Sequence, residues 1–152
     1  MRNTALDKDC YLGYDRSQYQ YIRMTFNCDS TTGDAFWIEK MPSRTGRDEY
    51  AIGYDNCLLY TRKDKNAEFR CGEMMKDSFY IMQEGFFNMD PHPYQIGFLD
   101  ATRDCPLTYS YSKMEKVVGS TGRYVRKRIG RFDCDVYAPF TSDNYFIRKG
   151  KP

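Results

Sequence analysis

The chain has 152 residues, of which 16% are aromatic and 29% charged, with a net charge of +2. This is the length of one domain, predicted to span residues 1–152, and no stretch has the roughly 18 apolar residues that a transmembrane helix needs. So small a net charge argues against nucleic acid as the partner. The 14 Tyr and 10 Phe favour strands, because aromatic side chains suit a half-buried pleated surface.

Apolar and polar residues alternate along most of the chain, which is typical of half-buried strands. In chain order, we expect strands over residues 22–28, 36–41, 50–60, 79–83, 94–99, 107–111, 131–137 and 145–148. Turn-forming residues separate them at 30–34, 42–46, 90–93 and 119–122. Residues 66–76 fit either a short helix or a strand. The prediction is an all-β fold, mainly an antiparallel sandwich or barrel of about eight short strands with at most one short helix.

Six cysteines are spread along the chain without a C-x-x-C pair, at Cys10, Cys28, Cys57, Cys71, Cys105 and Cys134. A zinc site usually needs a closely spaced pair of ligands, and the chain has one histidine, His92, so no metal is predicted. We expect three disulfides that stabilise the fold, although six cysteines allow 15 pairings. Disulfides predict a secreted or extracellular protein. Because residues 1–9 are polar and unlike a signal peptide, this would be the mature form. Six unrelated buried thiols in a cytosolic protein remain the alternative.

Two stretches of the sequence resemble each other. Phe-Asn-Cys-Asp at 26–29 is followed by an aromatic segment at 36–40, and Phe-Asp-Cys-Asp at 132–135 is followed by one at 145–149. Each stretch reads as a strand that ends in cysteine, a loop and an aromatic return strand. We therefore expect two β-hairpins, which arise either by convergence on hairpin chemistry or by duplication.

No catalytic residue or cofactor is predicted. Ser110 to Lys113 matches S-x-x-K and Ser142 to Asn144 matches S-D-N, but the K-T-G motif that completes the β-lactamase set is missing. His92 lies between two prolines without a neighbouring nucleophile, so it reads as a surface turn residue. The D-x-D pairs Asp7/Asp9 and Asp133/Asp135 offer too few oxygens for calcium.

Basic residues gather in the last third of the chain. Residues 101–152 carry 11 Lys and Arg against 5 Asp and Glu, whereas residues 1–100 carry 12 against 16. We name as the basic segment six predicted binding residues: Arg123, Tyr124, Arg126, Lys127, Arg128 and Arg131. On one continuous strand, Tyr124, Arg126 and Arg128 would share a face, with Lys127 and Arg131 opposite. Such a cluster attracts anions, and the alternative is an edge strand that Lys and Arg protect from aggregation.

Three functions follow as hypotheses. The first is a non-enzymatic secreted or cell-surface recognition or assembly module that binds a protein, another copy of itself, or an anionic glycan or surface through tyrosine and arginine. In the second, Glu49-Tyr50-Ala51-Ile52-Gly53-Tyr54 resembles a late strand of arthropod lipocalins, which implies a barrel carrying a small apolar ligand; the N-terminal G-x-W motif of that family is missing. The third is a small hydrolase with paired carboxylates.

Overall fold

The computed structural model describes residues 2–3, 10–16, 21–29, 33–43, 46–83, 93–100, 103–117, 119, 121–135 and 145–147. Their regular structure consists of strands alone, as the alternating sequence predicts. The strands are β1 (Arg2–Asn3), β2 (Cys10–Arg16), β3 (Ile22–Asn27), β4 (Trp37–Met41), β5 (Glu49–Tyr54), β6 (Cys57–Thr61), β7 (Ala67–Cys71), β8 (Phe79–Gln83), β9 (Pro93–Leu99), β10 (Asp104–Tyr111), β11 (Glu115–Lys116), β12 (Tyr124–Val125), β13 (Arg128–Phe132) and β14 (Tyr145–Phe146).

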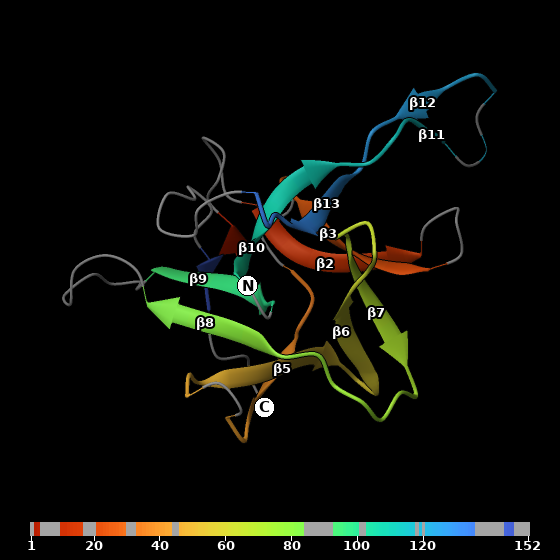
Figure 1. Cartoon of the computed structure of the whole chain (residues 1–152). Coiled ribbons are helices and arrows are strands. Elements are labelled where there is room, and N and C mark those ends of the chain that lie inside the picture. The colour runs from red at the N-terminus through yellow and green to blue at the C-terminus, as the bar shows by residue number, and fades with distance from the viewer. Residues whose placement is uncertain are drawn as a thin grey trace.

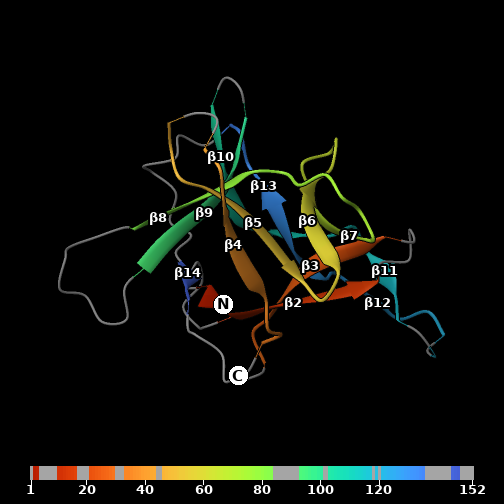
Figure 2. The ribbon, with the colours of Figure 1, turned by 90° about the horizontal axis from the view of Figure 1, so that it is seen from below.

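Twelve of these strands form one large antiparallel sheet that closes on itself (Figures 1 and 2), and β11 and β12 form a separate two-stranded sheet. Pairing of β3 with β7 and of β9 with β10 completes a ring in the order β3-β7-β6-β5-β8-β9-β10-β13. The strands β2, β1 and β14 form a second path between β3 and β9, and β4 pairs with β5. The predicted antiparallel β architecture is therefore confirmed. In the part of the chain that is described, no helix is long and apolar enough to cross a membrane.

Aromatic and aliphatic side chains fill the interior of this sheet. Leu12, Phe79, Phe132 and Tyr145 are completely or almost completely buried. The hydroxyl of Tyr145 donates a hydrogen bond of 2.7 Å to the backbone oxygen of Leu107, so the polar end of this ring is satisfied inside the core. The many tyrosines and phenylalanines in the sequence thus supply much of the core.

Three disulfides each join neighbouring antiparallel strands. Cys57 of β6 lies opposite Cys71 of β7 and is bonded to it. The other two bonds, Cys10–Cys28 and Cys105–Cys134, connect β2 to the end of β3 and β10 to the residues after β13. No cysteine is free, so the predicted disulfide stabilisation is confirmed.

Two local predictions need correction. Residues 50–60 are not one strand but two, β5 and β6, because the chain turns at Asp55, whose φ of 46° is left-handed. Of the two readings left open for residues 66–76, the strand is confirmed, because this stretch contains β7 and its apolar residues Ala67 and Phe69 are buried. In the described part of the strand expected at 131–137, β13 spans Arg128–Phe132 and ends before residue 133, whereas residues 136–137 lie outside the described residues.

The two predicted hairpins are wrong as well. The segment β4 pairs with β5 rather than with β3, and β14 pairs with β1 and β9 rather than with β13. Both β3 and β13 are instead bound by other strands, and the disulfides of Cys28 and Cys134 tie their ends to β2 and β10. Pairing across the sheet therefore overrides the similarity between the two stretches.

Candidate functional site

The hairpin of β10 and β13 extends away from the barrel as a two-stranded ribbon of β11 and β12 (Figure 1). We call the described residues 112–117, 119 and 121–127 the arm. Backbone hydrogen bonds continue along it from Ser112 N to Lys127 O and from Val117 N to Arg123 O. Glycines at positive φ, Gly119 and Gly122, lie at its predicted turn, where left-handed backbone favours glycine. The arm presents side chains to solvent beyond the body of the fold.

A buried ion cluster anchors the arm to the barrel. Arg23 of β3 is 3% exposed and Glu115 of β11 is 6% exposed. Two hydrogen bonds join them, Nη1 to Oε2 at 2.5 Å and Nη2 to Oε1 at 3.0 Å. The other side of the Arg23 guanidinium donates to Asp15 of β2, with Nε 2.7 Å from Oδ1. Two bidentate carboxylates thus hold one arginine in a fixed position.

The same cluster shifts the ionisation of its members. Burial alone would lower the pKa of Arg23, but its hydrogen bonds to Glu115 and Asp15 outweigh burial and raise that pKa. The hydrogen bond from Arg23 lowers the pKa of Glu115 against the opposing effect of burial. Both groups therefore stay charged at neutral pH. A carboxyl group that acts as a general acid needs a raised pKa, and the pKa of Glu115 is lowered.

The basic segment is not one continuous strand, so its side chains divide among three places. Arg123 and Tyr124 lie on the outer part of the arm, Tyr124 in β12 and Arg123 just before it. Residues 126–127 interrupt the strand between β12 and β13, which lets Arg126, Lys127 and Arg128 line one groove. Arg131 lines a separate cavity. The division of faces expected for a continuous strand is therefore wrong.

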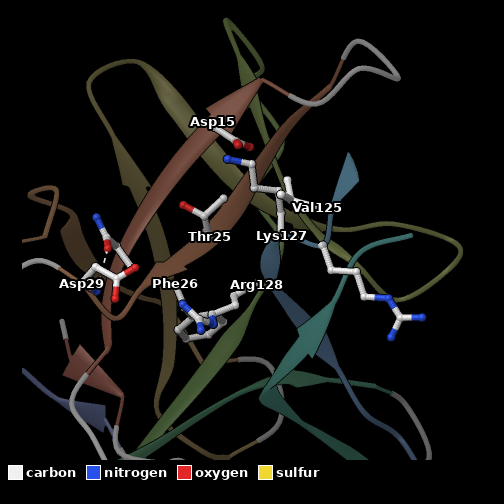
Figure 3. Close-up of a pocket in the computed structure, with 9 residues that line it drawn as sticks. Asp15, Thr25, Phe26, Asp29, Val125, Lys127 and Arg128 are labelled. Atoms are coloured by element: carbon white, nitrogen blue, oxygen red, sulfur yellow. Dashed lines mark hydrogen bonds between the residues drawn. The ribbon is translucent and has the colours of Figure 1, made fainter. Parts of the chain in front are cut away.

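The groove has a volume of about 410 Å³ and lies between the end of the arm and strands β2 and β3 (Figure 3). Thr25 and Asn27 line the side opposite the basic residues. In Figure 3, Lys127 extends toward the side of Asp15, and Arg128 lies near Phe26. The groove therefore sets cations against amide, hydroxyl and carboxylate groups, with Phe26 and Val125 as apolar parts of its lining.

No cation of the basic segment forms an ion pair with a carboxylate of another described residue. The ion pairs between described residues use Arg23, Lys40, Arg47, Arg62, Arg70 and Lys76. None of these belongs to the basic segment. The positive charges of Arg123, Arg126 and Lys127 therefore face solvent without a described carboxylate within ion-pair distance.

Tyr109 and Tyr111 lie in β10 at the base of the arm, where Tyr111 is opposite Arg128. The sequence did not identify either of them as a site residue. Tyr109 donates a hydrogen bond of 3.3 Å to the hydroxyl of Tyr111. Burial, together with this bond, raises the pKa of Tyr109 to about 12. The bond from Tyr109, aided by Arg128, lowers the pKa of the exposed Tyr111. The alternation of tyrosine with polar residues along 107–111 predicted a strand, but it gave no indication of a binding role.

The other candidate chemical groups do not assemble into a described catalytic or metal site. Asp100 lies near Cys105 and Cys134, but these sulfurs are bonded to each other and are not thiolate ligands. Asp133 accepts a hydrogen bond from the backbone nitrogen of Asp135. Ser110 to Lys113 runs from the end of β10 into the arm rather than opening a helix. His92, Asp7, Asp9 and Ser142 to Asn144 lie outside the described residues.

Comparison with protein-family models, curated proteins and solved structures finds no match to this chain. Geometry and charge therefore supply the basis for a functional proposal.

Proposed function

We propose that this chain is a non-enzymatic secreted or cell-surface recognition module that binds an anionic partner through the arm and the basic segment. The observation that carries the proposal is the set of exposed cations at Arg123, Arg126 and Lys127, which no described ion pair uses. A cation without an internal partner gives up only hydration and side-chain freedom when it meets an external anion.

The presentation of these cations supports binding. Tyr111 at the base of the arm and Met114 and Tyr124 on the arm are about half exposed, and tyrosine and arginine supply large contact areas at interfaces. The Arg23–Glu115 ion pair fixes the base of the arm. A surface that is already fixed loses less entropy when it binds a partner.

The three disulfides support the extracellular part of the proposal. Such bonds persist in oxidising compartments and are rare in the cytosol. All six cysteines are paired, none is free, and each bond links adjacent strands. This arrangement is suited to a domain that works outside the reducing cytosol.

The other two hypotheses receive less support from the described residues. Asp15 and Glu115 converge, but both carboxylates bind Arg23, and the pKa of Glu115 is lowered. Hydrolysis by paired carboxylates calls for an acid with a raised pKa. A carrier of apolar ligands needs a mainly apolar pocket, whereas Phe79, Phe132 and Tyr145 pack inside this barrel.

The test is retention of the protein on immobilised heparin, a sulfated polysaccharide, during elution with salt. The variant Arg123→Ala/Arg126→Ala/Lys127→Ala removes three exposed cations from the surface. A control with the same change in charge, Lys40→Ala/Lys63→Ala/Lys76→Ala, removes exposed lysines elsewhere. We expect the first variant to elute at clearly lower salt than the wild type and the control. Equal elution of both variants would show that net charge alone governs retention and would overturn the proposal.

A further inference from the structure

A second cavity lies on the opposite side of β13 from the groove. Its volume is about 590 Å³, and its lining includes Arg62, Ser110, Lys113 and Arg131. Side chains alternate between the faces of a strand, so Arg131 points away from the side that Arg128 occupies. The volume falls within the range of small-molecule sites, roughly 300–1,000 Å³.

The charges of this cavity do not cancel. Glu115 is bound to the buried Arg23, and Asp64 is paired with Arg62 at 3.3 Å. Lys113 and Arg131 also line the cavity, and no ion pair between described residues involves either of them. The cavity therefore has two cations in excess of its internal pairs.

The wall of the cavity is also fixed in place. Arg62 stacks over the ring of Tyr21, with its guanidinium carbon 3.9 Å from the ring centroid. It also pairs with Glu68 at 3.4 Å. The Arg23 side chain, at the inner wall, is held by four hydrogen bonds to Asp15 and Glu115. Arg23 and Arg62 therefore need little rearrangement when a ligand enters the cavity.

Hydrogen-bonding groups line the cavity together with Lys113 and Arg131. The cavity is lined by the hydroxyls of Ser110, Ser112 and Tyr111 and by the amide of Asn66. Hydroxyls and amides can both donate and accept hydrogen bonds, which suits a ligand that carries several hydroxyls. Lysine and arginine bind carboxylate and sulfate.

We infer that this cavity binds one acidic sugar unit of a glycan, with its anionic group between Lys113 and Arg131. The inference rests on the proposed function, because it makes the anionic partner a polysaccharide and places one of its units. Arg131 is the member of the basic segment inside the cavity, so the rest of a longer glycan extends toward the arm. Carboxylate and sulfate share the chemistry that these residues recognise.

The experiment is calorimetric titration with three soluble probes: an unsulfated uronic acid–hexosamine disaccharide, its sulfated counterpart and a neutral disaccharide. We expect at least one acidic probe to bind the wild-type protein and the neutral probe to bind at least tenfold more weakly. The two acidic probes show whether carboxylate suffices or sulfate is required. Equal binding of the neutral probe, or no binding of any probe, would overturn the inference.

Variants locate the site. We expect Lys113→Gln/Arg131→Gln to weaken binding of the acidic disaccharide at least tenfold, whereas the charge-matched control Lys40→Gln/Lys76→Gln, at exposed lysines outside both sites, leaves it unchanged. The single variant Lys113→Glu repeats the test at an exposed position of the arm and reverses the charge, with circular dichroism as the check of folding. Unchanged disaccharide affinity in both cavity variants would contradict the inference.

Heparin binding distinguishes failure of the cavity inference from failure of the proposed function. If heparin binds the wild type through the basic segment but no disaccharide binds, the cavity inference fails and the proposed function stands. If a disaccharide binds in the cavity but heparin retention does not depend on the basic segment, the cavity site stands and the proposed function fails.

Discussion

Arg23 and Glu115 are 92 residues apart in the sequence and form a buried, two-bond ion pair between β3 and β11. The pair connects the barrel to the arm at the point where the arm leaves the β10–β13 hairpin. Asp15 holds the same guanidinium from β2, so three strands meet at one side chain. A buried charge with satisfied hydrogen bonds adds geometric definition even where its net contribution to stability is small.

Replacing Arg23 tests this anchor. Arg23→Met leaves Glu115 buried without a countercharge, so we expect a loss of about 3–5 kcal/mol in the free energy of unfolding. Urea denaturation at neutral pH measures it. Lys40→Met is the control, because Lys40 and Asp48 form an exposed pair, and such pairs contribute about 0–1 kcal/mol. Similar losses for both variants would mean that Arg23 does not act as a buried anchor.

The pH dependence of stability tests Glu115. Its pKa in the folded protein lies below the usual 4.5 because Arg23 donates hydrogen bonds to it. The stabilisation is therefore complete above the pKa of the unfolded chain and is lost as pH falls through the folded pKa. Glu115→Gln should be less stable than the wild type at pH 7, and the gap should close below the folded pKa. Urea titrations at several pH values check this, and a gap that widened in acid would contradict it.

Removal of one disulfide should destabilise the protein without changing its fold. The Cys57–Cys71 bond closes a short loop, with a sequence separation of 14, and a loop of this size corresponds to about 3 kcal/mol. We expect Cys57→Ala/Cys71→Ala to lose about that much stability in thermal or urea unfolding. Peptide mapping without reductant should recover the three pairings described above. A mapped bond between Cys57 and any other cysteine would refute the arrangement of β6 and β7.

A contact between an aromatic ring and a glycine explains a further position. Gly97 of β9 lies opposite Tyr80 of β8, and a Cβ at Gly97 would come within 2.3 Å of the Tyr80 ring. Tyr80 is buried and donates a hydrogen bond to Gln95, so it has little room to move. Gly97→Ala should cost about 1–3 kcal/mol through overpacking. In a Tyr80→Leu background the same change should cost less, and an equal cost in both backgrounds would exclude this explanation.

The class of fold could be predicted because alternation and cysteine spacing are local properties of the sequence. Residues 22–28 and 94–99 alternate clearly, and they form β3 and β9. The turn at Asp55 was missed because apolar residues continue on both sides of it. The closure of the sheet could not be predicted from the sequence, because the pairing of β3 with β7 depends on contacts between segments that are distant in the chain.

For the candidate site too, features set by neighbouring residues could be predicted, and features set by distant contacts could not. The basic segment was visible because its charges are close together in the sequence. Its distribution over the arm, the groove and the cavity depends on the break in the strand at residues 126–127, which charge patterning does not report. Arg23 and Glu115 gave no signal, because a single arginine in an alternating strand looks like a solvent-facing residue.

The salt dependence of heparin binding tests the central claim most directly. Release of counterions makes the logarithm of an electrostatic association constant fall linearly with the logarithm of salt concentration, with a slope that grows with the number of cations in contact. We predict that Arg123→Ala/Arg126→Ala/Lys127→Ala gives weaker binding and a shallower slope than Lys40→Ala/Lys63→Ala/Lys76→Ala. Identical slopes and affinities for the two variants would contradict the assignment of the basic segment as the anion-binding surface.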